Sequence, residues 1–197
     1  MPRKTVQAER RQQILEALYK CLLKKPFHET SIKDIAVKAG VNHGVLHYYF
    51  KSKEDILLHF MDYILDKYVI IFADFILSAE KKGLKGKKMV LSMLNHINTQ
   101  ITFNHDLSKV FIEIWHIATY NKKVKKKLNR TYEEWEKTLS LILKRNGLDA
   151  TTSGRMATAF IALHEGISLF SVILERKDHR IEGVLKELQS NIIQMLP

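Results

Sequence analysis

The 197-residue chain has a single cysteine, Cys21, and this scarcity excludes a framework of disulfide bonds. Cys21 falls on the apolar side of a helical segment, so we expect a small buried residue in a reducing compartment. No signal-peptide pattern precedes the first helical segment, and no apolar run approaches the roughly 20 residues of a membrane span. The longest candidate run, residues 68–77, is interrupted by Asp74. These absences predict a soluble, cytoplasmic protein that does not interact with membranes.

Several signatures of enzymes are also missing. The sequence has no glycine-rich loop that would cradle a phosphate and no nucleophile elbow. A Glu-x-x-His pair, Glu113 and His116, occurs once, whereas a carboxylate di-iron bundle needs two such pairs and further carboxylates. His43 and His47 stand four residues apart without a third metal ligand nearby. We therefore predict no enzymatic activity, no cofactor and no metal site, and a helical metal-binding enzyme is the weakest alternative.

What the chain does have is an excess of basic residues, 32 Lys and Arg against 21 Asp and Glu. Of the net charge of +11, +7 belongs to residues 1–53, which hold eleven basic and four acidic residues. Such a charge suits a polyanionic partner such as nucleic acid. Charge alone does not decide the matter, because a lysine run such as residues 122–127 is typical of a solvated surface.

Residues 30–55 contain, in order, the parts of a helix-turn-helix. A first short helix ends at Gly40, because glycine adopts a left-handed conformation without steric cost. A second helix begins at Asn42 and buries Leu46, and a third begins at Ser52. The serines that precede the first and third helices each have an aspartate three residues later, which is the spacing of a capping box.

The outer face of the second helix is the surface that would enter a DNA major groove. At about 100° per residue, Gly44, His47 and Tyr48 lie opposite the buried leucine, with His43 and Val45 on the flanks. Glycine permits close approach of the backbone, histidine donates hydrogen bonds to bases or phosphates, and valine packs against a thymine methyl group. Side chains suited to phosphate oxygens are those of Thr30, Ser31, Tyr48, Tyr49, Lys51 and Lys53.

This segment resembles the DNA-binding domain of the TetR family of one-component transcriptional regulators, from about Arg11 to Leu58. The residues that carry the resemblance are Ile14-Leu15, Thr30-Ser31, Ile35-Ala36, Ala39-Gly40-Val41, Gly44, Leu46, Tyr49-Phe50, Lys53-Glu54 and Leu57. The resemblance implies phosphate or base contacts from Thr30, Asn42, His43, Gly44, Val45, His47, Tyr48 and Lys53. His43, Val45 and His47 depart from the residues usual in the family, so the resemblance does not specify the operator sequence.

The rest of the chain has helical periodicity, with no strand alternation and no internal repeat. We predict an all-α fold of about nine helices, with a DNA-binding head at residues 1–52 and a ligand-binding and dimerisation bundle at residues 53–197. A long helix from Ser52 to Lys81 links the two and ends at a Lys- and Gly-rich break. Further helices are expected at Met89–Phe103, Leu107–Tyr120, Val124–Asn146, Thr152–Arg176 and Ile181–Met195.

The segment from Ala157 to Leu174 is apolar almost all round and carries small residues that permit close approach of another helix. The surface helix of a monomer would not have this pattern. In TetR relatives this region pairs with its copy in a second subunit, so the resemblance implies a homodimer through the last two helices and a palindromic operator. A purely intramolecular core is the alternative.

Aromatic residues are more numerous in the predicted bundle than its closure needs, and a few polar side chains accompany them, as in a small-molecule site. The candidate ligand-binding residues are Phe103, Phe111, Trp115, His116, Tyr120, Trp135 and His164. Further aromatic or polar candidates are His96, Asn98, Tyr132, Phe160 and Glu165. An ordinary core with hydrogen-bonded histidines is the alternative, and the resemblance favours the cavity.

Together these features predict a ligand-responsive repressor, released from its operator by a small, largely apolar effector. The effector would prefer a form whose two recognition helices are wrongly spaced for DNA. Activation instead of repression stays open. The main alternative is a nonspecific DNA-binding protein, whose affinity should vary little between DNA sequences while depending strongly on salt.

Overall fold

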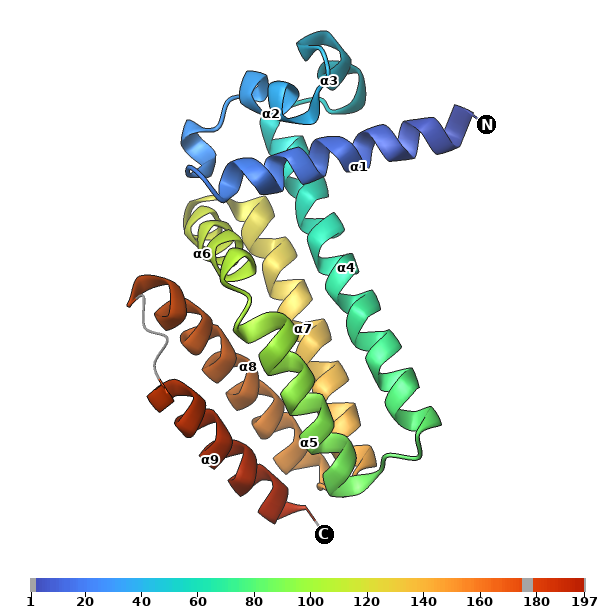
Figure 1. The fold of residues 1–197 in the computed structure, drawn as a ribbon, viewed down its shortest axis with the longest axis vertical. Helices are drawn as coiled ribbons and strands as arrows, with labels where there is room; N and C mark the ends of the chain where they lie inside the picture. Colours follow the sequence, from blue (N-terminus) through green and yellow to red (C-terminus); the bar gives the residue numbers. More distant parts are fainter. Residues whose placement is uncertain (1–2, 175–178, 197) are drawn as a thin grey trace.

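The structure of the chain, a computed structural model, describes residues 3–174 and 179–196. Over these residues the chain forms nine α-helices, a 3-10 turn at Phe27–Glu29 and a π-helical turn at Asn98–Thr102, and no strand (Figure 1). The predicted all-α fold is confirmed. The helices are α1 Arg3–Leu22, α2 Ile32–Ala39, α3 His43–Tyr49, α4 Lys53–Lys81, α5 Gly86–Ile97, α6 His105–Tyr120, α7 Lys122–Arg145, α8 Ala150–Ile173 and α9 His179–Met195.

Local capping interactions set the starts of α2 and α4 in the head. Ser31 Oγ accepts a hydrogen bond from the Asp34 N–H at 3.0 Å, and the Asp34 carboxylate accepts from the Ser31 N–H at 2.7 Å, so the expected capping box is present. Ser52 Oγ accepts from the Asp55 N–H at 3.0 Å. The Asp55 carboxylate, however, accepts from the Lys51 N–H at 2.9 Å. In a regular capping box it would accept from the N–H of Ser52, so the second capping box differs from the expected one by one residue.

The turn between α2 and α3 has the conformation that the sequence predicted. Gly40 has φ 63°, in the left-handed region where glycine is favoured. Asn42 caps α3, because its side chain accepts a hydrogen bond from the Gly44 N–H at 3.0 Å. Leu46 is fully buried, which leaves the opposite side of α3 facing away from the protein.

Helix α4 connects the head to the body. Its first turns bury Leu57 and Phe60 in the same apolar cluster as Leu18 of α1 and Val110 of α6. Head and body therefore share a continuous core. The boundary between residues 52 and 53 stays a prediction, and this core extends across it.

Helix α5 ends earlier than the sequence predicted. It stops at Ile97, and the chain widens into the π-helical turn, which is closed by the Phe103 N–H donating to the Asn98 carbonyl at 3.0 Å. A π turn adds a residue to the helical repeat and so changes which side chains face inward. Asn98 and Thr102 are both buried here, against α8.

Helix α8 packs against α6 and α7, and α9 packs against α5. Figure 1 shows α8 and α9 side by side at one edge of the body. The helix predicted at 152–176 is present from Ala150 to Ile173, and residues 175–176 lie outside the described part of the chain.

Helix α8 is long and apolar enough to cross a membrane by length and composition alone, the one such helix in residues 3–174 and 179–196. Its most apolar window of 18 residues contains two adjacent polar residues, His164 and Glu165, which do not offset the surrounding apolar residues. The expectation that no segment has this property is therefore wrong. Only 28% of that window is buried within the single chain, so α8 exposes an apolar surface.

Candidate nucleic-acid interface and ligand cavity

The outer face of α3 presents polar and aromatic side chains to solvent. Tyr48 is 73% exposed, Val45 is 40% exposed, and His43 and His47 are exposed beside them. The two imidazole rings pack edge to face, with 4.8 Å between centroids. Seven of the nine predicted DNA-binding residues are exposed on α3 or at the starts of α2 and α3, namely Ser31, Asn42, His43, Gly44, Val45, His47 and Tyr48.

Thr30 and Lys53, the other two, hold the turn that precedes α2. Thr30 is fully buried, and its hydroxyl donates to the Pro26 carbonyl at 3.1 Å. Lys53 Nζ lies 4.3 Å from the centroid of the Phe27 ring and donates to the His28 carbonyl at 3.3 Å. Burial lowers the pKa of Lys53. In this structure both side chains therefore bind the protein's own turn, Thr30 from a buried position and Lys53 from a partly exposed one.

Arg11 fixes the end of α3 against α1, a role that the sequence analysis did not assign. Its Nη1 donates to the Tyr49 carbonyl at 2.9 Å, and its guanidinium carbon lies 4.6 Å from the centroid of the Phe50 ring. This contact joins residues 38 positions apart, so no local pattern could have indicated it.

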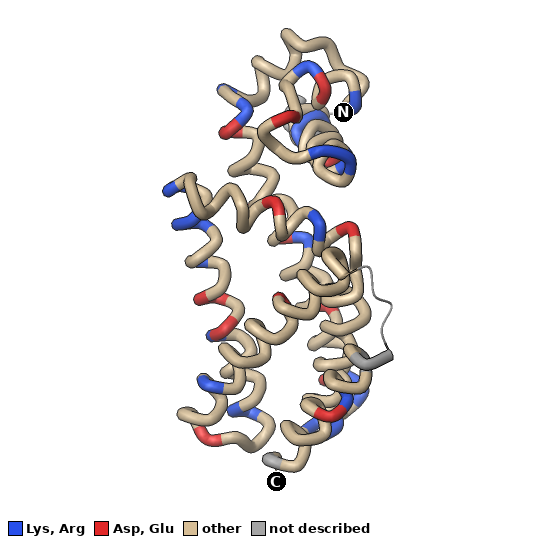
Figure 2. Tube along the Cα trace, turned by 90° about the vertical axis from the view of Figure 1, so that its left-hand side faces the viewer, with Lys and Arg blue, Asp and Glu red and all other residues tan. Residues whose placement is uncertain are grey.

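Positive charge in the head is distributed over several elements rather than collected in one block (Figure 2). Lys33 and Lys38 of α2 and Lys51 after α3 are exposed, and none of them forms an ion pair within the described residues. Lys25, in contrast, pairs with Asp34 at 2.8 Å. Hydrogen bonds from Lys25 and then from Ser31 hold the pKa of Asp34 well below its usual range.

Two sets of polar contacts join the head to the body. On α6, Glu113 Oε1 accepts a hydrogen bond from the Phe27 N–H at 2.7 Å. At the start of α4, the Glu54 carboxylate accepts from Asn121 Nδ2 and from Lys123 Nζ, each at 2.8 Å. The turn before α2 and the first turn of α4 are therefore both held by the body.

The Glu113-His116 pair does not form a metal site in this arrangement. Glu113 is occupied by the head, while His116 is exposed beside Tyr120, with 5.8 Å between ring centroids. In the described part of the chain, no group of three or more His, Cys, Asp or Glu side chains is arranged to hold a metal ion.

A cavity of about 560 Å³ lies in the body between α4, α6, α7 and α8. Its volume falls in the range of roughly 300–1,000 Å³ that small-molecule sites occupy. The aromatic rings of its wall are Tyr68, Phe72, Phe111, Trp135 and Phe160. Its polar side chains include Glu80, Thr138, Arg145, His164, Glu165 and Ser168.

Three of the seven predicted ligand-binding residues, Phe111, Trp135 and His164, line this cavity. Phe111 and Trp135 come from neighbouring helices and lie 6.1 Å apart between ring centroids. His164 enters from α8. Aromatic composition had indicated these residues, and the helix packing brings them together.

The other four predicted residues do not line the cavity. Tyr120 is 84% exposed, Phe103 is 42% exposed, and His116 is also exposed. Trp115 is partly buried against the core, and its Nε1 donates to the Tyr132 hydroxyl at 2.7 Å. For His116 and Tyr120 the reason is the rotation of α6 about its own axis, which places both residues on the side of the helix that faces solvent.

The sequence analysis missed the contribution of α4. Tyr68, Phe72 and Ile76 line the cavity at intervals of four residues, so they share one face of the helix. This spacing was the available signal. The helix that was predicted to link head and body therefore also forms one wall of the cavity.

Two adjacent residues of α8 have opposite electrostatic environments. His164 Nδ1 lies 2.8 Å from the Phe160 carbonyl and Nε2 lies 2.8 Å from the side chain of Asn98, while burial lowers the pKa of His164 to about 4. Glu165 Oε1 accepts a hydrogen bond from the Tyr132 hydroxyl at 2.9 Å, and burial raises the pKa of Glu165 to about 7. At neutral pH the imidazole is therefore uncharged and the carboxyl group is near its midpoint.

Residues 14–60 match the family described as bacterial regulatory proteins, tetR family. The HTH-type transcriptional regulator BetI of Yersinia pestis is 38% identical over 65 residues, which are 33% of this chain and 33% of that protein. The similarity thus spans about a third of the length of that curated relative.

Solved structures resemble the chain over nearly its whole length. A TetR transcription regulator from Haloarcula marismortui has a TM-score of 0.80 at 19% identity, covering 96% of this chain and 100% of that one. A transcriptional regulator from Saccharomonospora viridis in complex with choline has a TM-score of 0.74 at 21% identity, covering 95% and 96%. FadR from Bacillus subtilis in complex with stearoyl-CoA has a TM-score of 0.74 at 19% identity, covering 93% and 98%. At these identities the likeness establishes the fold.

Proposed function

We propose that the chain is a tetR-family repressor that binds a palindromic operator as a homodimer and is released by a small, largely apolar effector. The observation that supports this most strongly is that an exposed recognition helix and a cavity of about 560 Å³ occur in one chain with a shared core. The repressor would act in the cytoplasm, where its operator is accessible.

The proposed DNA-binding surface is the outer face of α3 with the start of α2. Gly44 supports this assignment, because the nearest atom to a Cβ built there is Asn42 Oδ1 at 3.8 Å. The fold itself therefore has room for a larger residue at this position. A requirement for glycine would come from outside the chain, as when the DNA backbone approaches the helix closely.

The proposed dimer interface is the exposed apolar stripe of α8. Its members follow one another at intervals of three or four residues and are Ala159, Ala162, Gly166, Phe170 and Ile173. Phe170 is 52% exposed and Ile173 is 63% exposed in the single chain. On α9, Val184 and Leu188 add exposed apolar surface. A second copy related by a two-fold axis would cover these residues and present two α3 helices to half-sites about 34 Å apart, or a multiple of this.

The proposed coupling between cavity and DNA runs through α6 as well as through α4. Phe111 of α6 lines the cavity, and Glu113, two residues later, holds the Phe27 N–H of the head. An effector that displaces Phe111 would thus shift the turn before α2. DNA affinity would fall by the ratio of the effector's affinities for the two forms, whatever its absolute affinity.

The proposed effector fits within the cavity and has a largely apolar body. The structural neighbours named above bind choline in one case and stearoyl-CoA in another, so this fold accepts both a small cation and an acyl group. The mostly apolar wall of the present cavity is compatible with the hydrocarbon part of either kind of ligand.

The first experiment is fluorescence anisotropy with DNA that flanks the gene of this protein, at near-physiological salt and with excess unrelated DNA. Tight binding at a palindrome that resists the competitor is expected. Weak binding that the competitor abolishes, with a steep salt dependence and little variation between sequences, would instead identify a nonspecific DNA-binding protein.

The same assay tests the proposed role of α3. Replacing His43 and His47 by Ala should weaken operator binding by about tenfold or more, because contacts with bases are each worth roughly 1–3 kcal/mol. Sedimentation should show an unchanged oligomeric state. Unchanged operator affinity would contradict the assignment of this face.

A further inference from the structure

The chemical class of the effector follows from one side chain of the cavity wall, provided that the cavity is the effector site proposed above. Glu165 lies on α8 and lines the cavity. Its Oε1 is held by the Tyr132 hydroxyl at 2.9 Å, and no partner of Oε2 occurs among the described residues. No Lys, Arg or His forms an ion pair with Glu165 in the part of the chain that the structure describes.

A hydrogen-bonded chain orients this carboxyl group. Trp115 Nε1 donates to the Tyr132 hydroxyl at 2.7 Å, and that hydroxyl in turn donates to Glu165. Burial and the adjacent carboxyl group raise the pKa of Tyr132, so the phenol stays a donor. The Glu165 carboxyl group is therefore fixed in position, and its Oε2 is left to bind a ligand.

A series of aromatic rings leads from Tyr132, the hydrogen-bond partner of Glu165, into the cavity wall. The Tyr132 and Trp135 rings meet edge to face, with 5.5 Å between centroids, and Trp135 lies 6.1 Å from Phe111. Aromatic faces attract cations through their quadrupole, and tryptophan does so most strongly. A carboxyl group that lines the same cavity as tryptophan and phenylalanine rings is a suitable environment for an organic ammonium group.

The charge of the wall agrees with a cationic ligand, although the whole chain is basic. The wall has two carboxyl groups, Glu80 and Glu165, and one basic side chain, Arg145, because His164 is uncharged at neutral pH. Arg145 lies ten residues beyond Trp135 on α7, which is about 15 Å along the helix. An ammonium group could reach Glu165 without meeting a positive charge nearby.

We propose that the effector is a substituted or quaternary ammonium compound, whose cationic head lies between Glu165, Trp135 and Phe111 and whose hydrocarbon part extends along α4. Phe72 and Ile76 of α4 line the cavity and supply the surface for that hydrocarbon part. The cavity has room for such a tail, since about 560 Å³ far exceeds a bare ammonium group. A ligand with a carboxylate head would meet Glu165 as a like charge.

The test compares three probes that share a ten-carbon chain and differ in head charge: decyltrimethylammonium, 1-decanol and decanoate, each below the concentration of micelle formation. Calorimetry and the fluorescence of Trp135 and Trp115 report binding to the full-length protein. The ammonium probe should bind at least about tenfold more tightly than the alcohol, as one good charge interaction predicts. Equal or tighter binding of decanol or decanoate would overturn the proposal, as would no binding of any probe.

A charge-removing variant sharpens the comparison. Glu165→Gln keeps an oxygen that accepts from Tyr132 and should lower affinity for decyltrimethylammonium by about tenfold or more while changing affinity for decanol by less than about threefold. Glu133→Gln, on the exposed side of α7, is the matched control and should change neither affinity. Circular dichroism would show whether each variant is folded. Full retention of ammonium affinity in folded Glu165→Gln protein would overturn the assignment.

The pH dependence gives an independent readout. Affinity for the ammonium probe should rise between pH 6 and pH 8 in the original protein, because a proton on Glu165 competes with the cation, and it should be flat in Glu165→Gln. The other titratable or charged groups that line the cavity or contact Glu165 are Tyr68 and Glu80 of α4, Tyr132 and Arg145 of α7, and His164 of α8. The wall residues from α5 and α6 are apolar. A rise that persists unchanged in Glu165→Gln would assign the effect to another group and contradict the proposal.

Operator binding separates this inference from the proposed function. Release of DNA by decyltrimethylammonium supports both. Release by decanol or decanoate alone would overturn the ammonium assignment and leave a ligand-responsive repressor. Glu165-dependent binding of the ammonium probe without any effect on DNA would support the binding site and count against the proposed response.

Discussion

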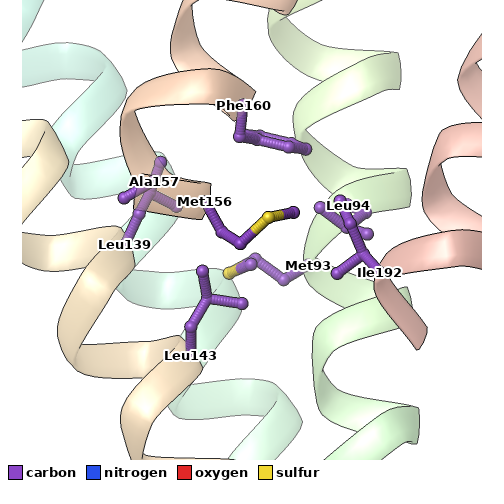
Figure 3. Close-up of a pocket in the computed structure, with 8 residues that line it drawn as sticks. All are labelled: Met93, Leu94, Leu139, Leu143, Met156, Ala157, Phe160 and Ile192. Carbon is purple, nitrogen blue, oxygen red and sulfur yellow. The ribbon is translucent and has the colours of Figure 1, made fainter. Parts of the chain in front are cut away.

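The body of the protein contains two regions built partly from the same helices but packed to different degrees. Where α5 and α9 meet α7 and α8, the side chains of Met93, Met156 and Leu143 meet across the helices and leave a void of only about 10 Å³ (Figure 3). Between α4, α6, α7 and α8 about 560 Å³ stays open. Leu139 and Phe160 line both regions.

The comparison shows that the open region is not a consequence of poorly packing side chains. Helices α7 and α8 pack closely where α5 and α9 cover them, because only about 10 Å³ stays empty there. What differs is α4, which contacts α1 near its start and α5 near its end and lies along the open side of the cavity. The cavity is thus set by the position of one helix, which also carries the head.

The largest expected difference between the two regions is in the free energy of unfolding that is lost when a wall residue is shortened, and two neighbouring residues of α7 allow the comparison. Leu143 borders the closed void, and Ile142 borders the cavity. Leu143→Ala should lower the free energy of unfolding by about 2–5 kcal/mol, because it creates an empty space in a filled core. Ile142→Ala should cost about half as much, since its side chain already faces open space. Urea unfolding at one protein concentration measures both, and equal losses would contradict the distinction.

Replacing a wall residue by a larger one should also lower stability by different amounts in the two regions. Ala157 is fully buried beside the closed void, so Ala157→Ile should cost about 1–3 kcal/mol through overpacking. Ile161, four residues later, lines the cavity, and Ile161→Phe should cost less than about 1 kcal/mol. Thermal unfolding gives the ranking. A penalty for Ile161→Phe as large as that for Ala157→Ile would mean that the cavity is closed in solution.

A third test uses the opposite pKa shifts at the cavity wall. His164 is harder to protonate when folded, so its contribution to stability is lost as pH falls from about 6.5 towards 4. Glu165 holds its proton more tightly when folded, so its contribution is lost as pH rises from about 4.5 to 7. The two slopes oppose each other between pH 4.5 and 6.5. Glu165→Gln should therefore show a steeper loss of stability on acidification, on the order of 1–2 kcal/mol across this range.

Urea unfolding of Glu165→Gln at several pH values provides the measurement. Glu133→Gln is the control, because Glu133 is exposed on the same helix as the cavity residue Trp135. A profile for Glu165→Gln that matches the original protein would show that the folded state does not perturb the two groups in opposite directions.

The smallest effect on folding is expected on the outer face of α8. A Cβ built at Gly166 meets nothing within 4 Å, so Gly166→Leu should leave the fold of the single chain intact. It should instead loosen the proposed dimer, which sedimentation velocity detects as a shift towards monomer. Gly154→Leu is a matched control, since Gly154 is also in α8 with nothing within 4 Å but lies off the stripe. An unaltered sedimentation profile for Gly166→Leu would count against this interface.

The sequence predicted the head in detail because its signals act over a few residues. Ser31, Gly40 and Asn42 each set a helix boundary through hydrogen bonds or backbone conformation within four positions. The end of α5 could not be predicted from such local signals, since the π-helical turn depends on how its buried residues meet α8. The contacts of Lys53 with the turn before α2 could not be predicted for a similar reason, because its partners lie 25 or more residues away.

The cavity was predictable only in part. Its aromatic character was evident from composition, and Phe111, Trp135 and His164 were identified correctly as residues that could line one space. Composition does not contain the rotation of each helix about its axis, so it could not show that His116 and Tyr120, both candidates for the cavity, face solvent instead. That rotation is decided by packing between helices.

The π-helical turn at Asn98–Thr102 has a consequence for how this site could change over generations. The turn contains an extra residue relative to an α-helix, and Gln100 within it is exposed. Deleting Gln100 would remove the extra residue, so the turn could close as a regular α-helical turn while the residues before and after it keep their places. Ile101 lies on the cavity wall within this turn, so its side chain is the one whose direction would change. A change in chain length by one residue could thus give the protein a new ligand preference while every other wall residue stays the same.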